Sequence, residues 1–240
     1  EDLGQSRINA QNVFNSLPDR GMVVKLLQEN KLEYNPDLLN NPNSVNKYST
    51  EFYKAANLGI YGSDLCVASS FEQTQESMIF LKCVNILSNY MGVNSAFDQK
   101  MFERIEASNN NKDSVMKIVI NAFRRVDEIL KSNNRSGISA VILSGCWIEG
   151  LYISCRMAET VNHESIIKAI LSQHESLKNL IVMMENEKRE QNAAFILNEL
   201  RNLKSIFDQV QIDKNLDKES ISSITKKITE IRTRIVTVPA

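Results

Sequence analysis

The sequence has few of the residues that interrupt secondary structure. Its 240 residues include only 8 glycines and 4 prolines, which is typical of long helices joined by short loops. An excess of one charge is also missing, because 28 lysines and arginines almost balance 29 aspartates and glutamates and leave a formal net charge of −1. Without excess positive charge there is no electrostatic basis for holding the phosphates of a nucleic acid. We therefore expect no nucleic acid among the partners.

A long uninterrupted hydrophobic run is missing as well. The most apolar stretch, residues 138–153, contains Ser139, Ser144 and Glu149 and so falls short of the roughly 18 consecutive apolar residues of a membrane-spanning helix. We interpret this stretch as a core helix and expect no transmembrane segment. The chain begins at Glu1 rather than at a methionine, so we expect any targeting signal to lie before it.

Motifs for metals and cofactors are missing too. The only histidines, His163 and His174, lie about 16 Å apart on one predicted helix, which is too far for a shared metal ion. Neither histidine begins H-E-x-x-H or follows the glutamate that di-iron bundles require. The sequence also contains no glycine-rich phosphate loop, no G-x-S-x-G and no C-x-x-C-H. We expect no metal, no cofactor, and solvated histidines near helix caps.

Paired cysteine motifs are missing although the chain has four cysteines. Cys66, Cys83, Cys146 and Cys155 all fall within apolar helical patterns. Cys146 and Cys155 lie about 13 Å apart along one predicted helix, so they cannot form a disulfide. A bridge between Cys66 and Cys83 across a helical hairpin is the alternative to four buried free thiols, which is the state we expect.

Amphipathic helical patterns fill the chain from Ser49 onward. Apolar residues recur at spacings of three and four, and strand-like alternation is never sustained. The predicted helices cover about 49–70, 77–91, 96–108, 114–132, 138–153, 162–184, 192–210 and 221–235. We expect an all-α antiparallel bundle of about eight helices, forming one domain over 49–240. The preceding segment, 1–48, is predicted to be irregular, with one short helix at 21–32 followed by turns rich in Asn and Pro.

Three details of these helices are predicted. Ser49 or Thr50 is expected to cap the first helix, and Ser95 the third. The apolar face of the second helix is predicted to comprise Phe80, Cys83, Val84, Leu87, Tyr90 and Met91. The last helix carries a narrow isoleucine seam, Ile221, Ile224, Ile228, Ile231 and Ile235. Such a seam suits helix packing; we expect it to pack against its own chain, with docking onto a partner helix as the alternative.

An internal repeat is also predicted, with halves at 49–133 and 135–236. At an offset of 86 residues, Gly59 aligns with Gly145 and Tyr61 with Trp147. Similar amphipathic helices follow each of these two segments. Because each glycine costs helix propensity of roughly 1 kcal/mol, we expect the glycines at 59, 62, 145 and 150 to allow close helix packing.

Two isolated acids are the candidate functional residues. Asp64 is the only charged residue between Lys54 and Glu72, and Glu149 is the only one between 135 and 156. If their helices are neighbours, the two carboxylates could share one interior site as a general acid and base. In the structural alternative, each accepts hydrogen bonds from a tyrosine, a backbone amide or an arginine such as Arg124 or Arg125. The predicted ligand-binding residues are Tyr61, Asp64, Trp147, Glu149 and Tyr152.

The stretches around these acids resemble a known group. Tyr61, Gly62, Asp64 and Leu65 form a Tyr-Gly-x-Asp-Leu stretch, and residues 145–152 form Gly-x-Trp-Ile-Glu-x-Leu-Tyr. Both are similar to stretches in uncharacterised all-helical envelope proteins, often lipoproteins, of Bacteroides-type bacteria. The resemblance covers roughly residues 50–160. It implies a periplasmic or cell-envelope location and a lipid anchor upstream of Glu1, but no activity. Four thiols are unusual in an oxidising compartment, so a cytoplasmic location is the alternative.

Three functional hypotheses follow. The first is a non-catalytic envelope protein that binds a ligand or a protein partner in a cleft beside Tyr61, Asp64, Trp147 and Glu149. The second is a hydrolase in which Asp64 and Glu149 act as acid and base. The third is a purely structural module that docks through its isoleucine seam.

Overall fold

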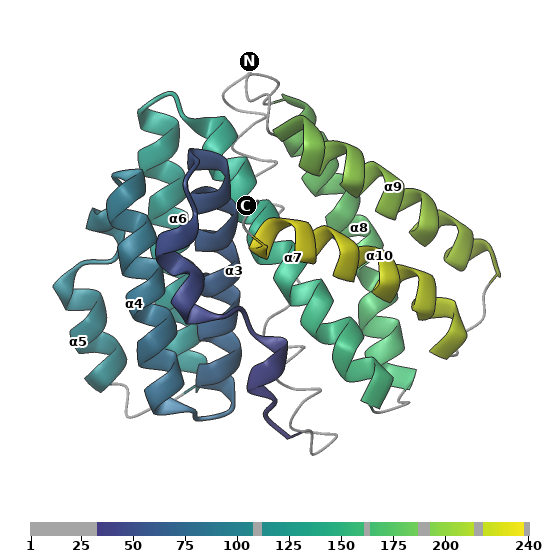
Figure 1. Ribbon diagram of the computed structural model, residues 1–240, viewed down its shortest axis with the longest axis horizontal. Helices are drawn as coiled ribbons and strands as arrows, with labels where there is room; N and C mark the ends of the chain where they lie inside the picture. Colours follow the sequence, from purple (N-terminus) through teal and green to yellow (C-terminus); the bar gives the residue numbers. More distant parts are fainter. Residues whose placement is uncertain (1–32, 108–111, 161–163, 187–192, 214–217, 238–240) are drawn as a thin grey trace. The chain divides into compact units, whose positions relative to one another are not determined.

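The computed structural model describes residues 33–107, 112–160, 164–186, 193–213 and 218–237 (Figure 1). These residues form eight α-helices and three short 3-10 helices, with no strand among them. The α-helices are α3 (Glu51–Ser70), α4 (Thr74–Met91), α5 (Gln99–Ala107), α6 (Lys112–Ser132), α7 (Ser136–Thr160), α8 (Glu164–Asn186), α9 (Ala193–Asp213) and α10 (Lys218–Val236). The all-α prediction is confirmed, whereas the short helix predicted at 21–32 lies outside the described residues.

The chain divides into two compact units. The N-terminal unit comprises Tyr34–Cys146, and the described part of the C-terminal unit comprises Glu33 and the described residues from Trp147 onward. The division falls inside α7, so this helix contributes its first part to one unit and its second part to the other. The single domain expected over 49–240 and the internal repeat, with halves at 49–133 and 135–236, both stay predictions.

A strap of turns precedes the helices of the N-terminal unit. It contains the 3-10 helices η1 (Pro36–Leu38) and η2 (Pro42–Lys47), capped by the side chains of Asn35 and Asn41. A proline stands at the start of each 3-10 helix, where its missing N–H costs nothing. The Asn and Pro residues therefore act as the caps and turn formers that the sequence predicts. We call residues 34–48 the strap.

Helix α3 packs against α7 through two glycines, as the sequence predicts. A Cβ added at Gly59 would lie 2.0 Å from the carbonyl oxygen of Ile142, and one at Gly145 would lie 2.0 Å from that of Ala56. Ser63 donates a hydrogen bond of 2.9 Å to the carbonyl of Cys146 across the same contact. Gly62 faces α6 instead, where an added Cβ would lie 2.3 Å from the ring of Phe123. The loss of helix propensity at these glycines is thus offset by close packing.

The starts of the first and third predicted helices show one success and one error. Thr50 caps α3 by accepting a hydrogen bond from the backbone N–H of Tyr53 at 3.3 Å, as predicted. The predicted cap at Ser95 is wrong, because Asn94–Ala96 forms a 3-10 helix (η3) and α5 begins only at Gln99. The carboxylate of Asp98 accepts from the N–H of Met101 at 3.0 Å instead, and an aspartate at this position caps a helix at least as well as a serine.

Helix α4 buries the predicted apolar face with one exception. Phe80, Cys83, Val84, Leu87 and Met91 are buried, but Tyr90 is 64% exposed. Its assignment to the buried face is wrong because position 90 lies about 80° around the helix from Phe80. The ammonium of Lys54 lies 5.2 Å from the centre of the Tyr90 ring, a cation–π contact at the surface.

The C-terminal unit consists of the second part of α7 with α8, α9 and α10 (Figure 1). All five isoleucines of the seam are buried, and α10 packs against α9 and α8. Glu199 of α9 binds both Lys227, at 2.5 Å, and Arg234, at 3.1 Å, on α10. The seam is therefore used inside this unit, and docking of the seam onto a partner stays a prediction that requires α10 to leave its place.

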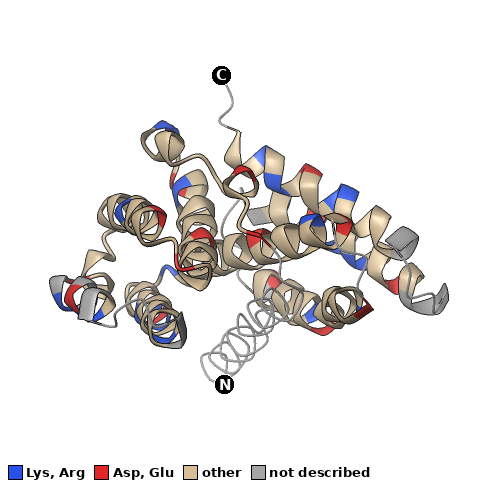
Figure 2. Cartoon of the chain, turned by 90° about the horizontal axis from the view of Figure 1, so that it is seen from below, with Lys and Arg blue, Asp and Glu red and all other residues tan. Residues whose placement is uncertain are grey.

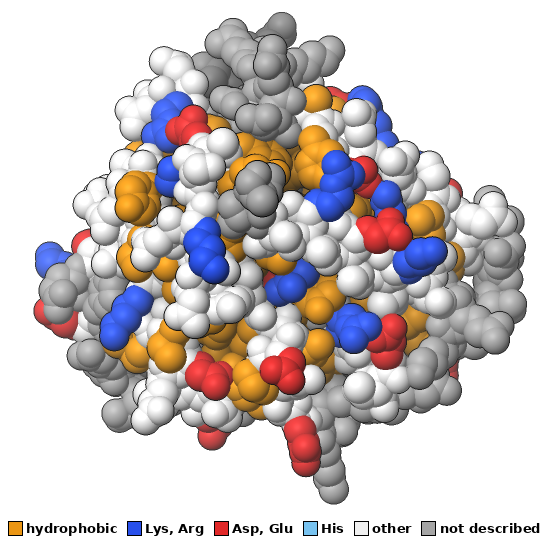
Figure 3. Space-filling view, viewed as in Figure 1, with side chains coloured by type: hydrophobic (Ala, Val, Ile, Leu, Met, Phe, Trp, Pro, Cys, Tyr) orange, Lys and Arg blue, Asp and Glu red, His pale blue; other side chains and the backbone are white. Residues whose placement is uncertain are grey.

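Helix α7 has the length and composition of a membrane-spanning helix, but most of it is buried inside the protein. The sequence predicted too short an apolar stretch, because α7 continues beyond residues 138–153 to Ser136–Thr160, and the absence of a transmembrane segment stays a prediction. Charged residues of both signs are interspersed along the other helices (Figure 2) and over the face shown in Figure 3. All four cysteines are free and buried, and burial raises the pKa of the Cys155 thiol to about 12.

Candidate functional site

Glu149 forms a two-bonded ion pair inside the C-terminal unit. Its side chain is 0% exposed, and both oxygens accept hydrogen bonds from Arg232 on α10. The Arg232 Nε lies 2.9 Å from Oε2 and the Arg232 Nη2 lies 2.9 Å from Oε1. The planar guanidinium matches the carboxylate in the parallel arrangement that is the strongest form of this pair. The helix of the candidate acid is therefore bound to the last helix of the chain.

Tyr152 completes the environment of this ion pair. It lies three residues after Glu149, on the same face of α7. The Arg232 guanidinium carbon lies 4.4 Å from the centre of the Tyr152 ring, which adds a cation–π attraction. The Arg232 side chain is only 11% exposed. Glu149 and Tyr152 thus hold one arginine, and each has a direct role in placing α10.

This geometry limits what Glu149 can do chemically. A general acid or base must come within hydrogen-bond reach of a substrate atom, but both carboxylate oxygens already accept from a guanidinium. Removing one partner of a buried pair leaves the other charge uncompensated, at a cost of about 3–5 kcal/mol. The structural alternative for Glu149 is therefore the one that its contacts fit.

Asp64 is held by the strap of the N-terminal unit. Its side chain is fully buried, and its Oδ2 accepts a hydrogen bond of 3.2 Å from the backbone N–H of Asn40. The Asn40 side chain donates in turn to the hydroxyl of Tyr48 and to Oδ1 of Asn57, both at 3.1 Å. These bonds join the strap to α3 around the carboxylate, so Asp64 takes part in fixing the strap.

Tyr61 and Cys83 lie near this carboxylate and remain protonated. The Tyr61 hydroxyl donates to the carbonyl of Asn41 at 2.8 Å. Burial, together with Tyr48, Cys83 and Asp64, raises the pKa of Tyr61. Burial raises the pKa of the Cys83 thiol to about 12, and the charge of Asp64 acts in the same direction. The raised pKa values disfavour the phenolate and the thiolate, which are the forms that nucleophilic attack requires.

The five predicted ligand-binding residues are all buried, and they belong to two different units. Tyr61 and Asp64 belong to the N-terminal unit, whereas Trp147, Glu149 and Tyr152 belong to the C-terminal unit. The structure brings Tyr61 and Asp64 together with the strap, and it brings Glu149 and Tyr152 together with Arg232. A shared site for the two acids, and a cleft beside them, stay predictions.

The arginine that neutralises Glu149 is not one that the sequence suggested. Arg125 pairs with Asp98 at 3.6 Å and donates to the carbonyl of Ser95 at 2.9 Å. Arg232, the partner of Glu149, lies 83 residues away in sequence. One signal pointed to it, because Arg232 follows Ile228 by four residues and precedes Ile235 by three and therefore lies beside the buried seam.

The expectation of solvated histidines is wrong for His174, and His163 lies outside the described residues. His174 is buried, its ring stacks on Phe207 with 5.9 Å between ring centres, and its Nε2 lies 2.7 Å from Oδ1 of Asp208. Lys204 binds the other Asp208 oxygen at 2.6 Å. Lys204 first, and His174 after it, hold the pKa of Asp208 below its ordinary value. These contacts join α8 to α9.

Within the described ranges, no three His, Cys, Asp or Glu side chains gather in a way that could hold a metal ion. Comparison with protein-family models, with curated proteins and with solved structures gives no match.

Proposed function

We propose that this chain is a non-catalytic helical protein that acts by binding a protein partner. The observation that carries the proposal is the Glu149–Arg232 pair, in which both oxygens of the best catalytic candidate are engaged at 2.9 Å. A structural ion pair can shift the pKa of an acid and occupy its oxygens although the acid takes no part in catalysis. In this proposal Glu149 stabilises the fold, and the partner binds on the outer surface of the helices.

The remaining candidates support the same division. Asp64 and Tyr61 hold the strap, and Tyr152 packs against Arg232. A ligand that used these groups would have to displace contacts made within the chain. Binding of a partner on exposed helix faces requires no such rearrangement, and interfaces of this kind change the backbone little in most complexes.

The cell-envelope location and the lipid anchor upstream of Glu1 form a second part of this proposal and rest on the resemblance in sequence. Free thiols persist in an oxidising compartment when they are buried and distant from each other, and all four are buried here. Fractionation of cells that express the full-length gene distinguishes this location from the cytoplasmic alternative. Recovery in the cytosol would refute it.

An assay of hydrolysis tests the non-catalytic assignment. Parent protein, Glu149→Gln and Asp64→Asn are incubated with chromogenic esters, phosphate esters and glycosides. We expect equal background rates in all three, because neither carboxylate is free to contact a substrate. A turnover that the parent shows and that a folded Glu149→Gln protein has lost would establish the hydrolase alternative instead.

A further inference from the structure

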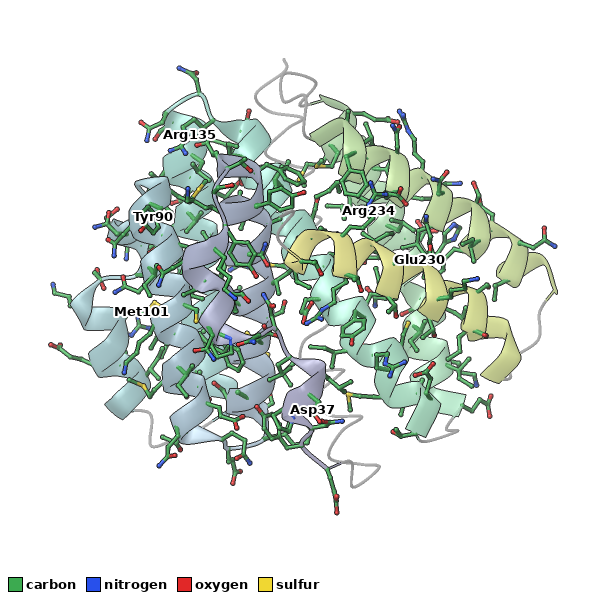
Figure 4. All side chains as sticks on the ribbon, in the orientation of Figure 1. Asp37, Tyr90, Met101, Arg135, Glu230 and Arg234 are labelled. Carbon is green, nitrogen blue, oxygen red and sulfur yellow. The ribbon has the colours of Figure 1, made fainter. Side chains whose placement is uncertain are left out.

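Exposed large hydrophobic side chains are rare in the part of the chain that the structure describes, and two of them lie on one helix. Among the described residues, only Ile79, Tyr90 and Val182 are large, hydrophobic and well exposed, at 41%, 64% and 45%. Ile79 and Tyr90 both lie on α4, and the half-buried Ile86 lies between them. Tyr90 is labelled in Figure 4, and the centre of its ring lies 5.2 Å from the ammonium of Lys54 on α3.

These three side chains form a stripe along the helix. Residues 79, 86 and 90 are separated by seven and four positions, which places them within about 40° of one another around the axis and spreads them over about 16 Å. We call this stripe, together with Lys82, the α4 outer face. An apolar stripe of this length matches the contact that one amphipathic helix makes with another.

The α4 outer face carries positive charge only. Lys82 is the only charged residue between Ser77 and Met91, it is exposed, and within the described ranges it makes no ion pair. Lys54 adds a second positive charge beside the Tyr90 ring. The acids three residues before Lys54 and before Ile79 have other partners, since Glu51 pairs with Arg135 at 2.5 Å and Glu76 accepts from Tyr34. The face is therefore an apolar stripe with basic margins.

We propose that the α4 outer face binds an acidic amphipathic helix of a partner protein. The inference rests on the proposed function and names its surface and the class of partner. Ile79, Ile86 and Tyr90 supply the apolar contact, and aromatic side chains such as Tyr90 are frequent binding hot spots. Lys82 and Lys54 select for carboxylates, which speeds association and excludes basic helices.

Charge also decides against a second copy of the chain. An antiparallel pairing of two α4 helices that sets Ile79 against Tyr90 places the two Lys82 side chains within about 8 Å of each other along the axis. A parallel pairing places them face to face. Like charges opposed in an interface are destabilising, so the face is complementary to an acidic partner and not to itself.

The test is a selection from a displayed library of helical peptides of about 16 residues against the purified full chain. We expect the recovered peptides to be acidic and amphipathic. Ile79→Ser and Lys82→Glu should each weaken their binding by about tenfold, and rising salt should weaken it further. Val182→Ser is the matched control, because it removes an equally exposed hydrophobic side chain from α8, and it should leave the affinity unchanged. Circular dichroism of each variant verifies that the fold is intact.

The other outcomes overturn the inference in different ways. Peptides that bind Lys82→Glu as tightly as the parent would show that partners bind elsewhere, which ends the α4 proposal and keeps the proposed function. A concentration-dependent dimer in analytical ultracentrifugation that Ile79→Ser abolishes would make a second copy the occupant. A selection that recovers no binder at all would count against both the inference and the proposed function.

Discussion

Removing one partner of the Glu149–Arg232 pair is expected to lower the unfolding free energy far more than removing both partners together. Glu149→Met leaves the Arg232 cation, whose side chain is 11% exposed, without its counter-charge, and Arg232→Met leaves a fully buried carboxylate without its cation. Each single change should cost about 3–5 kcal/mol of unfolding free energy. The double variant Glu149→Met with Arg232→Met removes both charges and keeps the volume. Its stability should lie within about 2 kcal/mol of the parent or above it.

The protein contains its own probe for this measurement. Trp147 is the single tryptophan, it is fully buried, and it belongs to the same unit as the ion pair. Its fluorescence in a urea titration therefore reports the unfolding of the C-terminal unit, and the three variants complete a double-mutant cycle with the parent. The expected coupling energy is several kcal/mol, because the two single losses far exceed the loss in the double variant.

A surface pair in the same unit provides the control. Arg201 and Glu185 join α9 to α8 at 2.6 Å, but their side chains are 50% and 38% exposed. Exposed pairs contribute about 0–1 kcal/mol, so Glu185→Gln should hardly change the transition. Losses below about 1 kcal/mol for both Glu149→Met and Arg232→Met would refute the reasoning, because the pair would then not hold α10.

Three further predictions follow from the packing and the charges. Gly59→Ala should lower the unfolding free energy by about 2 kcal/mol or more in the same urea titration, because the new Cβ would meet backbone atoms. Gly92→Ala should lower it by about 1–2 kcal/mol, because the positive φ of +70° is the only penalty there. The four buried thiols should react with a disulfide reagent at pH 8 only after unfolding, because burial raises the pKa of Cys83 and Cys155 to about 12; rapid reaction of the folded protein would contradict this. Because the pKa of Asp208 is lowered in the fold, its contribution to stability is present above its ordinary pKa of about 4 and is lost as the pH falls through the lower folded value. Asp208→Asn should therefore weaken the dependence of the unfolding free energy on pH in this acid range. An unchanged pH dependence would contradict the assignment.

Local features of the fold could be predicted from the sequence because they depend on residues close together in the chain. The apolar spacing on α4 and α6, the threonine cap of α3 and the isoleucine seam of α10 all follow from neighbours within four positions. The contact at Gly59 and Gly145 was also predictable, because a glycine inside an apolar helix is costly unless something packs on it.

The partners of the buried polar groups could not be predicted in the same way. The isolated position of Glu149 showed that the carboxylate must be neutralised, yet Arg232, Arg124 and Arg125 were equally suitable by charge. Only the tertiary arrangement places Arg232 beside it. Asp64 is a similar case, since its donor is a backbone N–H at Asn40, and every non-proline residue carries such a donor. The burial of His174 depends on Phe207 and Asp208, 33 and 34 residues away.

The Glu149–Arg232 ion pair also explains how the nearly uniform isoleucine seam of α10 packs in one register. The seam of α10 repeats isoleucine with a period of seven, because Ile221, Ile224 and Ile228 are followed seven residues later by Ile228, Ile231 and Ile235. Apolar packing alone would therefore tolerate a slip of α10 by seven residues. Such a slip would bring Thr225 or Pro239 to the position of Arg232 and leave Glu149 buried without a cation. A single buried polar contact is the best-attested way to fix helix register, so we expect the Glu149–Arg232 pair to favour the observed position of α10 over the slipped positions.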